Sequence, residues 1–336
     1  MDKITRCLIE KDSSCKPIWF MRQAGRYLPE FRKIRKLNPN FIKLCLNSEL
    51  SSEITLQPIK KFDLDAAIIF SDILIVPFAL GQQINFDKNH GPILSKLKTK
   101  NLLNTKKDRF ISTLSPIYTA IEKTKKKLKK NKALIGFIGA PWTLLVYMFG
   151  LKNKNNKREQ ISIKNQKDFS EIMEYLNNYL CLHIERQVNA GANVIQIFDS
   201  WSGLIEENKL IDYCFKPNLK IVNFCKKIGV PVITFPKGIK NKYKDFVEFV
   251  KPNGVNIDPD ISPSWAKLNL RDICIQGGMS PNILVNDLDH LKNTIDIYLE
   301  KFKNTPYIFN LGHGILPETD PETIKEVIRI VRNKNG

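Results

Sequence analysis

The sequence predicts an α/β fold built as a single (β/α)8 (TIM) barrel, and three observations lead to this prediction. Eight short runs of nearly continuous apolar residues have the character of parallel strands that are covered on both faces. Segments with an apolar period near 3.6 residues lie between these runs and indicate helices. No run is followed by GxGxxG or GxxxxGK[ST], motifs that would favour an open, doubly wound sheet. We therefore expect one domain over residues 1–336.

The predicted strands are spread along the whole chain. They are Pro17–Met21, Ala66–Phe70, Ala133–Phe137, Val194–Phe198, Pro231–Phe235, Gly254–Ile257, Ile273–Gln276 and Tyr307–Asn310. The intervals before the second and third strands are long. We therefore expect extra N-terminal and loop helices, one of them within Asn101–Lys130 on the outside of the barrel.

Three predicted helices have clear boundaries. Asp168–Ala190 shows apolar residues at helical spacing and is followed by Gly191, a typical stop signal. Leu284–Lys303 repeats this spacing. The last helix begins with Asp320 as N-cap and Pro321 at the first helical position. Helices between parallel strands form βαβ units, as the barrel requires.

Composition narrows the class of protein. The chain is 43% hydrophobic, enough for a large core, and it contains no apolar run of about 18 residues and no signal-peptide pattern. We expect a cytoplasmic protein that does not associate with membranes. Its seven cysteines are scattered without a CxxC spacing, and no two of its four histidines lie four residues apart. We therefore predict no metal site and no disulfide framework.

The formal net charge of +19 raises the possibility of a nucleic-acid partner. Most of the excess is lysine in runs such as Glu122–Lys130, a pattern typical of a solvated helix face. No nucleic-acid-binding motif accompanies it, so we expect no nucleic-acid partner. The charge can still attract polyanionic ligands over long range.

Polar residues and glycines follow every predicted strand, where barrel enzymes carry their active sites. In chain order they are Arg22–Tyr27, Ser71–Asp72, Gly139–Thr143 with Tyr147, Asp199–Gly203, Pro236–Gly238, Asp258–Asp260, Gly277–Pro281 and Gly312–Gly314. Asp199 could equally cap the next helix, and Asp258 and Asp260 are typical of a turn.

Potential cations outnumber acids at this end of the barrel. They are Arg22, Arg26, Arg35, Lys237 and His313. Asp72 follows a buried strand, and an acid there needs a donor partner, so we expect it to face a ligand. The arrangement favours a substrate with several carboxylates or phosphates, because the planar guanidinium group binds such groups in a bidentate way. Lys237 leaves open a second chemistry, Schiff-base formation.

Five segments, in order, resemble the uroporphyrinogen decarboxylase family. Pro17–Arg32 (PIWFMRQAGRYLPEFR) is similar to its N-terminal signature, and Gly136–Met148 (GFIGAPWTLLVYM) is similar to its second signature. The others are Phe70–Leu74 (FSDIL), Phe198–Gly203 (FDSWSG) and Phe309–Thr319 (FNLGHGILPET). The resemblance thus extends over nearly the whole chain.

The resemblance implies a (β/α)8 barrel that forms a homodimer with facing clefts. It implies a carboxy-lyase that converts the four acetate side chains of uroporphyrinogen III to methyls, giving coproporphyrinogen III and four CO2 in heme and tetrapyrrole biosynthesis. The family needs neither a metal nor an organic cofactor. Protonation of a pyrrole carbon creates a cation that accepts the electrons left by CO2, so the substrate serves as its own electron sink.

The resemblance also implies the site residues. Catalytic roles fall to Asp72, which accepts hydrogen bonds from the pyrrole N–H groups, and to Arg22 and Tyr147. The implied substrate-binding residues are Arg22, Gln23, Ala24, Gly25, Arg26, Arg35, Phe70, Ser71, Asp72, Ile73, Tyr147, Ser200 and His313. The proton donor stays open, because arginine is a poor general acid and a water or a substrate carboxylic acid could serve instead.

Two segments depart from the family pattern. Gly278 and Ser280 stand where the family usually has an Asn and an Asp, and Phe149–Glu159 (FGLKNKNNKRE) replaces a glycine-rich loop. Three alternative functions remain to be tested. A corrinoid- or folate-linked methyltransferase would hold zinc through His and Cys, but no His-x-Cys motif matches it. The others are a Schiff-base aldolase using Lys237 and an RNA- or polyanion-binding protein.

Overall fold

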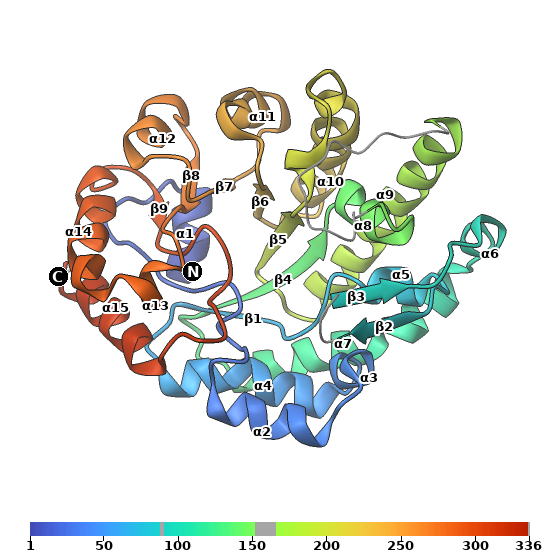
Figure 1. Ribbon diagram of the computed structural model, residues 1–336, viewed down its shortest axis with the longest axis horizontal. Helices are drawn as coiled ribbons and strands as arrows, with labels where there is room; N and C mark the ends of the chain where they lie inside the picture. Colours follow the sequence, from blue (N-terminus) through green and yellow to red (C-terminus); the bar gives the residue numbers. More distant parts are fainter. Residues whose placement is uncertain (88–90, 152–165, 335–336) are drawn as a thin grey trace.

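Seven parallel strands form one curled sheet in the computed structural model, which describes residues 1–87, 91–151 and 166–334 (Figure 1). The spatial order is β1-β4-β5-β6-β7-β8-β9, and all neighbouring pairs are parallel. The strands are β1 (Ala66–Ile68), β4 (Ala133–Gly139), β5 (Val194–Asp199), β6 (Val232–Pro236), β7 (Gly254–Ile257), β8 (Cys274–Gly277) and β9 (Tyr307–Ile308). A separate antiparallel hairpin pairs β2 (Ile84–Asp87) with β3 (Gly91–Leu94).

The prediction of a strand at Pro17–Met21, and with it a ladder of eight strands, is wrong. This segment makes a single parallel bridge, between Ile18 and Phe309. The reason is that side chains occupy its backbone donors: the N–H of Ile18 donates to Asp65 Oδ2 (2.7 Å), and that of Met21 donates to Asn310 Oδ1 (3.1 Å). The segment still lies between β9 and the start of β1, since Asp65 N donates to Ile18 O (2.8 Å).

Helices surround the sheet (Figure 1). They are α1 (Lys3–Ile9), α2 (Pro29–Leu37), α3 (Phe41–Cys45), α4 (Ser48–Lys61), α5 (Ile75–Ala79), α6 (Thr99–Leu103), α7 (Lys107–Lys127), α8 (Pro141–Met148), α9 (Gln166–Asn189), α10 (Lys216–Lys227), α11 (Tyr243–Val250), α12 (Pro263–Asn269), α13 (Ile283–Asn286), α14 (Leu291–Lys301) and α15 (Pro321–Asn333). The extra early helices are confirmed. In the described part of the chain, no helix combines the length and apolar character needed to span a bilayer.

The predicted helix ends follow local chemistry. Gly191 adopts φ +115° two residues after α9, and Asp320 accepts a hydrogen bond from Glu322 N (2.8 Å) at the start of α15. The single helix predicted over Leu284–Lys303 is instead divided into α13, a short 3-10 turn (Leu288–His290) and α14. The break falls at Asp287, whose φ of −149° lies outside the helical region.

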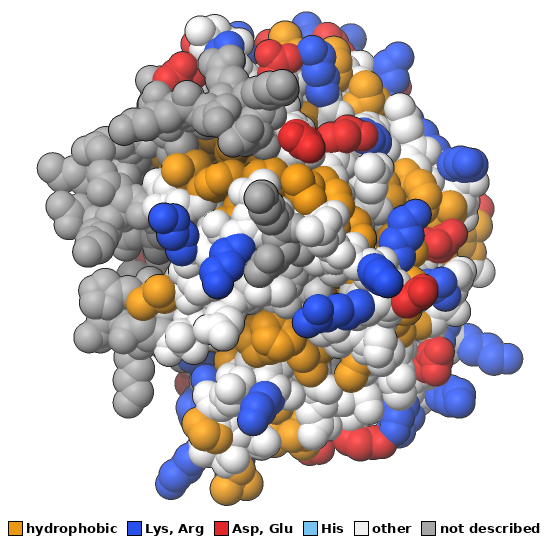
Figure 2. Space-filling model, turned by 90° about the vertical axis from the view of Figure 1, so that its right-hand side faces the viewer, with side chains coloured by type: hydrophobic (Ala, Val, Ile, Leu, Met, Phe, Trp, Pro, Cys, Tyr) orange, Lys and Arg blue, Asp and Glu red, His pale blue; other side chains and the backbone are white. Residues whose placement is uncertain are grey.

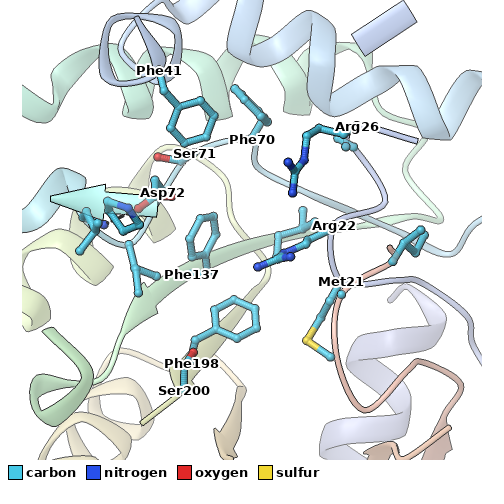
Figure 3. A pocket seen from close by; sticks show the side chains of 18 of the residues that line it. Met21, Arg22, Arg26, Phe41, Phe70, Ser71, Asp72, Phe137, Phe198 and Ser200 are labelled. Atoms are coloured by element: carbon cyan, nitrogen blue, oxygen red, sulfur yellow. Dashed lines mark hydrogen bonds between the residues drawn. The ribbon is translucent and has the colours of Figure 1, made fainter. Parts of the chain in front are cut away.

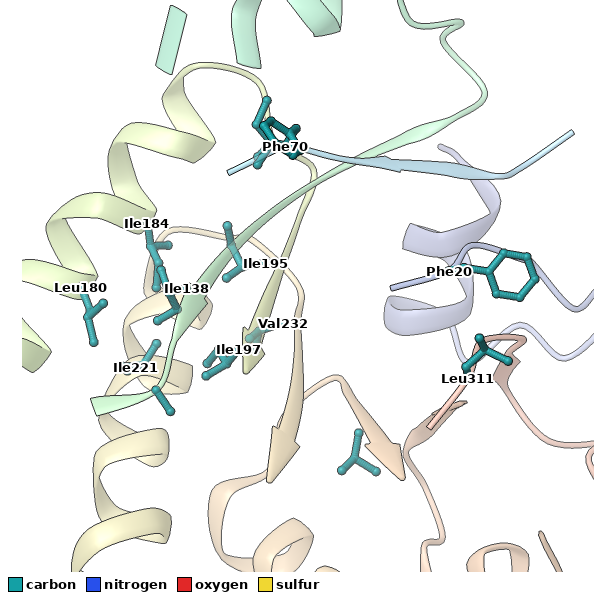
Figure 4. Packing of buried hydrophobic residues seen from close by; sticks show 14 of the residues in the cluster. Phe20, Phe70, Ile138, Leu180, Ile184, Ile195, Ile197, Ile221, Val232 and Leu311 are labelled. Carbon is teal, nitrogen blue, oxygen red and sulfur yellow. The ribbon is translucent and has the colours of Figure 1, made fainter. Parts of the chain in front are cut away.

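The outward side of the sheet forms the larger core. Ile138 of β4 and Ile195 and Ile197 of β5 belong to one buried cluster with Leu180 and Ile184 of α9 and Ile221 of α10 (Figure 4). Because residues of the same strands also lie in a second buried cluster on the inward side, both faces are covered, as their continuous apolar sequences predict.

The inward side of the sheet is closed at one end by α1. Ile4, Cys7 and Leu8 form a second buried cluster with residues at or near the strand starts. The strand members at this end include Ala66, Ala133, Val194, Ile233 and Cys274. Contact is close: a Cβ built on Gly254, the first residue of β7, would lie 2.7 Å from Leu8 Cδ2. Helix α1 thus leaves the opposite end, where the strands finish, uncovered.

Candidate active site

A cavity of about 850 Å³ opens at the carboxyl ends of the strands (Figure 3). Its walls combine the turn after Met21, the chain beyond β1, the ends of β4, β5 and β6, and the segment around His313. Of the implied substrate-binding residues, the cavity brings together Arg22, Ala24, Gly25, Arg26, Arg35, Phe70, Ser71, Asp72, Ile73, Tyr147, Ser200 and His313.

Gln23 is the exception, because its side chain holds the turn and does not line the cavity. It is buried, its Oε1 accepts from Phe20 N (3.0 Å), and its Nε2 donates to Ala66 O (3.0 Å). The hydroxyl of Tyr27 also donates to Gln23 O (2.8 Å). The Gln23 side chain thus has a structural role, and the predicted part of this residue in substrate binding stays a prediction.

Arg22 occupies the centre of one wall in an unfavourable backbone conformation. Its φ of +61° lies in the left-handed region that residues with a Cβ rarely adopt. Its side chain runs closely past Gly314, where a Cβ would lie 2.4 Å from Arg22 Cδ. Partial desolvation and the neighbouring Arg26 lower the pKa of Arg22, whereas Asp72 and Tyr147 act in the opposite direction. Two cations thus converge on one cavity wall, as Figure 3 shows.

Arg35 is a third cation in the cavity lining. Its Nη1 donates to Asn38 O (2.6 Å), and its guanidinium group lies 5.5 Å from the centre of the Phe41 ring. Arg32 is exposed and donates to the carbonyls of Arg26 (2.9 Å) and Tyr27 (3.0 Å). Arg32 therefore stabilises the turn, while Arg22, Arg26 and Arg35 face the cavity.

Asp72 stands across the cavity from Arg22 and Arg26 (Figure 3). Its Oδ1 accepts from Leu74 N (2.8 Å), which fixes the carboxylate locally. Desolvation raises the pKa of Asp72 to about 6, and the Leu74 hydrogen bond and the charge of Arg22 oppose this rise. The adjacent hydroxyl of Ser71 is buried without a hydrogen-bond partner among the described residues. Ser71 and Asp72 thus lie side by side in the cavity lining.

Tyr147, Ser200, Lys237 and His313 complete the polar lining. The Tyr147 ring packs edge-on against Trp201, with 5.9 Å between centroids, and burial raises the pKa of its hydroxyl. Burial, followed by the charges of Lys237 and Arg22, lowers the pKa of His313 to about 4. His313 is therefore neutral near pH 7 and does not add to the cations, contrary to the count made from the sequence.

The cavity also has an aromatic part that was not predicted from the sequence. Phe137, Phe198 and Phe235 line its floor, and the first two rings are 5.7 Å apart. Further lining residues that were not assigned to the site are Phe31, Phe41, Phe86, Gly91 and Pro92. The floor residues are the last inward-facing positions of β4, β5 and β6, so strand alternation was the signal that could have identified them.

The two departures from the family pattern lie outside the cavity lining or outside the described residues. Gly278 has φ +98°, and a Cβ there would lie 2.9 Å from the Tyr298 ring, so local backbone geometry requires glycine. Neither Gly278 nor Ser280 lines the cavity. Most of the altered loop Phe149–Glu159 falls in 152–165, which the structure does not describe. Within the described ranges, no group of three or more His, Cys, Asp or Glu side chains could hold a metal ion.

Comparison with known proteins identifies the family. The sequence model for uroporphyrinogen decarboxylase matches residues 1–334. A uroporphyrinogen decarboxylase of Rickettsia bellii is 39% identical over 94% of both chains, and one of Orientia tsutsugamushi (strain Ikeda) is 38% identical over 99% of this chain and 98% of its own. A methyltransferase from Methanosarcina mazei has the same fold (TM-score 0.81, 99% and 98% coverage) at 16% identity, which shows the fold alone. The chain belongs to the uroporphyrinogen decarboxylase family.

Proposed function

We infer that the chain is a carboxy-lyase that decarboxylates uroporphyrinogen in tetrapyrrole biosynthesis. The observation that best supports this function is that Asp72, the one acid among the described lining residues, faces Arg22 and Arg26 in one cavity. We propose that the substrate is the III isomer and that all four acetate arms become methyls, giving coproporphyrinogen III. Such a substrate carries many carboxylates around one ring of N–H donors, and the charges of the cavity complement this distribution.

The chemistry needs a stabilised cation. Protonation of the pyrrole carbon beside an acetate arm makes the ring positive, and the carbon–carboxylate bond then breaks. Its electron pair enters the ring as CO2 leaves. Protonation of the resulting methylene carbon and loss of the ring proton give a methylpyrrole. Asp72 accepts hydrogen bonds from the N–H groups, and its negative charge favours the cation, an electrostatic role that is typically large.

The three arginines of the cavity lining orient the acidic arms. Each close pair between Arg22, Arg26 or Arg35 and a carboxylate contributes roughly 4 kcal/mol at an effective dielectric near 20, before desolvation costs. Tyr147, Ser200 and neutral His313 offer further hydrogen bonds. A water or a substrate carboxylic acid held by Arg22 is the better proton donor, because an arginine stays protonated in proteins.

Further properties are proposed from the family resemblance. We propose one domain over residues 1–336, a closed (β/α)8 arrangement in which Pro17–Met21 takes the eighth place, a cytoplasmic homodimer, and catalysis without a metal or an organic cofactor. We also propose that the chain binds neither nucleic acid nor membranes. In support, the face seen in Figure 2 carries lysine and arginine side chains dispersed among acidic, polar and apolar ones.

The main test is anaerobic incubation of the purified protein with uroporphyrinogen III, followed by chromatography of the hepta- to tetracarboxylate products. We expect stepwise loss of carboxyl groups that EDTA does not inhibit. Correctly folded protein that yields no product would overturn the proposed function.

Schiff-base chemistry is the second candidate, because Lys237 lines the cavity. Borohydride trapping of a covalent adduct with substrate would favour it. A fully active Lys237→Ala variant would exclude it, and we expect that variant to retain turnover.

A further inference from the structure

The short stretch between β1 and Asp72 leaves the sheet before it reaches the cavity. β1 ends at Ile68, and the next backbone bond to the neighbouring strand runs from Ile69 N to Ile135 O (3.0 Å). Phe70 lies beyond this ladder, with its ring in the cavity wall. Its buried N–H and C=O therefore need other partners, since an unpaired buried backbone group is unfavourable.

Two hydroxyl groups of α4 provide these partners. Phe70 N donates to Thr55 Oγ1 (2.8 Å), and Ser51 Oγ donates to Phe70 O (2.6 Å). The Thr55 hydroxyl in turn donates to Ser51 O (2.7 Å), which fixes its orientation. Ser51 and Thr55 lie one helical turn apart on the same face of α4, and both are fully buried. At Phe70, hydrogen bonds from α4 thus replace those of the strand ladder.

Phe70, held in this way, lies two residues before Asp72, the carboxylate proposed to stabilise the cation. The Phe70 ring is further fixed by edge-on packing against Phe31 (5.6 Å between centroids) and Phe41 (5.9 Å). The Asp72 carboxylate then accepts a hydrogen bond from the backbone N–H of Leu74. The direction in which the Asp72 carboxylate points is therefore set by where Phe70 is held.

We propose that Ser51 and Thr55 are positioning residues for Asp72, holding the Phe70 backbone so that the carboxylate faces the bound macrocycle. The catalytic consequence rests on the proposed function of Asp72. Neither hydroxyl lines the cavity, so neither touches the substrate directly.

A matched control lies on the same helix. Ser52, next to Ser51, is also fully buried, and its hydroxyl is hydrogen-bonded to that of Thr124 in α7 (3.0 Å). This pair joins two outer helices and contributes nothing to the cavity wall. Removing it deletes the same two buried functional groups without releasing Phe70.

The test compares Ser51→Ala/Thr55→Val with Ser52→Ala/Thr124→Val. We expect both double variants to lose stability, but only the first to lose kcat, by roughly 10- to 100-fold, because small displacements of a catalytic group are costly. The midpoint of its kcat–pH profile should also move, and Thr55→Ser in place of Thr55→Val should restore most of the rate. Equal kcat values in the two double variants would overturn the proposal.

Two further measurements separate this proposal from the proposed function. In an Asp72→Asn background the loss caused by Ser51→Ala/Thr55→Val should vanish, since both act through one group. The titration of the Asp72 carboxyl carbon by NMR should shift in that double variant but not in the control, whether or not turnover occurs. If the double variant does not fold, Ser51→Ala alone is measured, and an unchanged kcat with an unchanged Asp72 titration overturns the proposal.

Discussion

The two ends of the curled sheet are built on opposite principles. At the carboxyl ends of the strands, charged side chains face an open cavity, the Ser71 hydroxyl lacks a partner among the described residues, and Arg22 adopts a left-handed backbone conformation. At the starts of the strands, α1 covers the sheet with Ile4, Cys7 and Leu8, all fully buried. The carboxyl ends of the strands thus hold desolvated charges and a strained backbone, whereas the starts of the strands are stabilised by apolar packing.

This contrast indicates which substitutions should change turnover without changing folding stability, and which should do the reverse. Strain and desolvated charge at a binding site are tolerated because the remaining structure is stable enough to hold them. Changes at the open end should therefore alter turnover with little loss of stability. Changes at the end covered by α1 should do the reverse.

The largest effect on rate should come from Asp72→Asn. The substitution keeps the shape of the side chain but removes its charge, so we expect kcat to fall by about 10²- to 10³-fold. Thermal stability should be retained, because a desolvated charge disappears. Asp260→Asn is the control: Asp260 also follows a strand, but it is exposed and outside the cavity. A wild-type rate in Asp72→Asn would refute the electrostatic role.

The same carboxyl group should control the response to pH. With a folded-state pKa of about 6, Asp72 loses its charge below that pH, and kcat/KM should fall tenfold per unit of pH. For a carboxyl whose pKa is raised on folding, the folded state binds more protons than the unfolded state between about pH 4 and 6. The free energy of unfolding should therefore decrease as pH rises through this window.

Subtracting the pH–stability curve of Asp72→Asn isolates this contribution from that of Asp199, another buried acid with a pKa raised to about 6. If the two curves run parallel from pH 4 to 7, the raised pKa of Asp72 is wrong. Rate–pH profiles of the same two proteins provide the second check, since the step near pH 6 should be missing from the variant.

A smaller loss of rate should follow from Gly314→Ala. The new methyl group would lie 2.4 Å from Arg22 Cδ and must displace that side chain, so we expect kcat/KM to fall roughly tenfold or more. Gly229→Ala is the control, because its φ of +72° costs roughly 1–2 kcal/mol of stability although the space around it is open. Steady-state kinetics should show a defect only in the Gly314 variant.

These contrasts also explain what the sequence could predict. Apolar runs marked the seven strands of the curled sheet but not the β2–β3 hairpin, and polar residues just beyond those seven assembled into one cavity because the ends of parallel strands meet at one edge. The features that were not predicted from the sequence depend on contacts between residues that are far apart along the chain. Gln23 turns toward Ala66, and Asp65 and Asn310 take backbone donors that a strand at Pro17–Met21 would use.

The charge state of His313 was missed for the same reason. Its neutral form results from burial beside Lys237 and Arg22, residues far away in the sequence. The aromatic floor follows from alternation along β4, β5 and β6, but only once it is known which face of each strand is turned inward.

The end covered by α1 offers the opposite test, with the smallest effect on rate. Leu8 is fully buried against Gly254, so Leu8→Ala should leave a cavity and lower the free energy of unfolding by about 2–5 kcal/mol. Ile9, the next residue, is 49% exposed, and Ile9→Ala should cost far less. Because α1 lies at the far end of the strands, the kcat and KM of folded Leu8→Ala should equal those of the wild type. Chemical denaturation and steady-state kinetics on the same preparations decide the matter, since a loss of kcat in Leu8→Ala that persists below its unfolding transition would mean that the two ends are coupled.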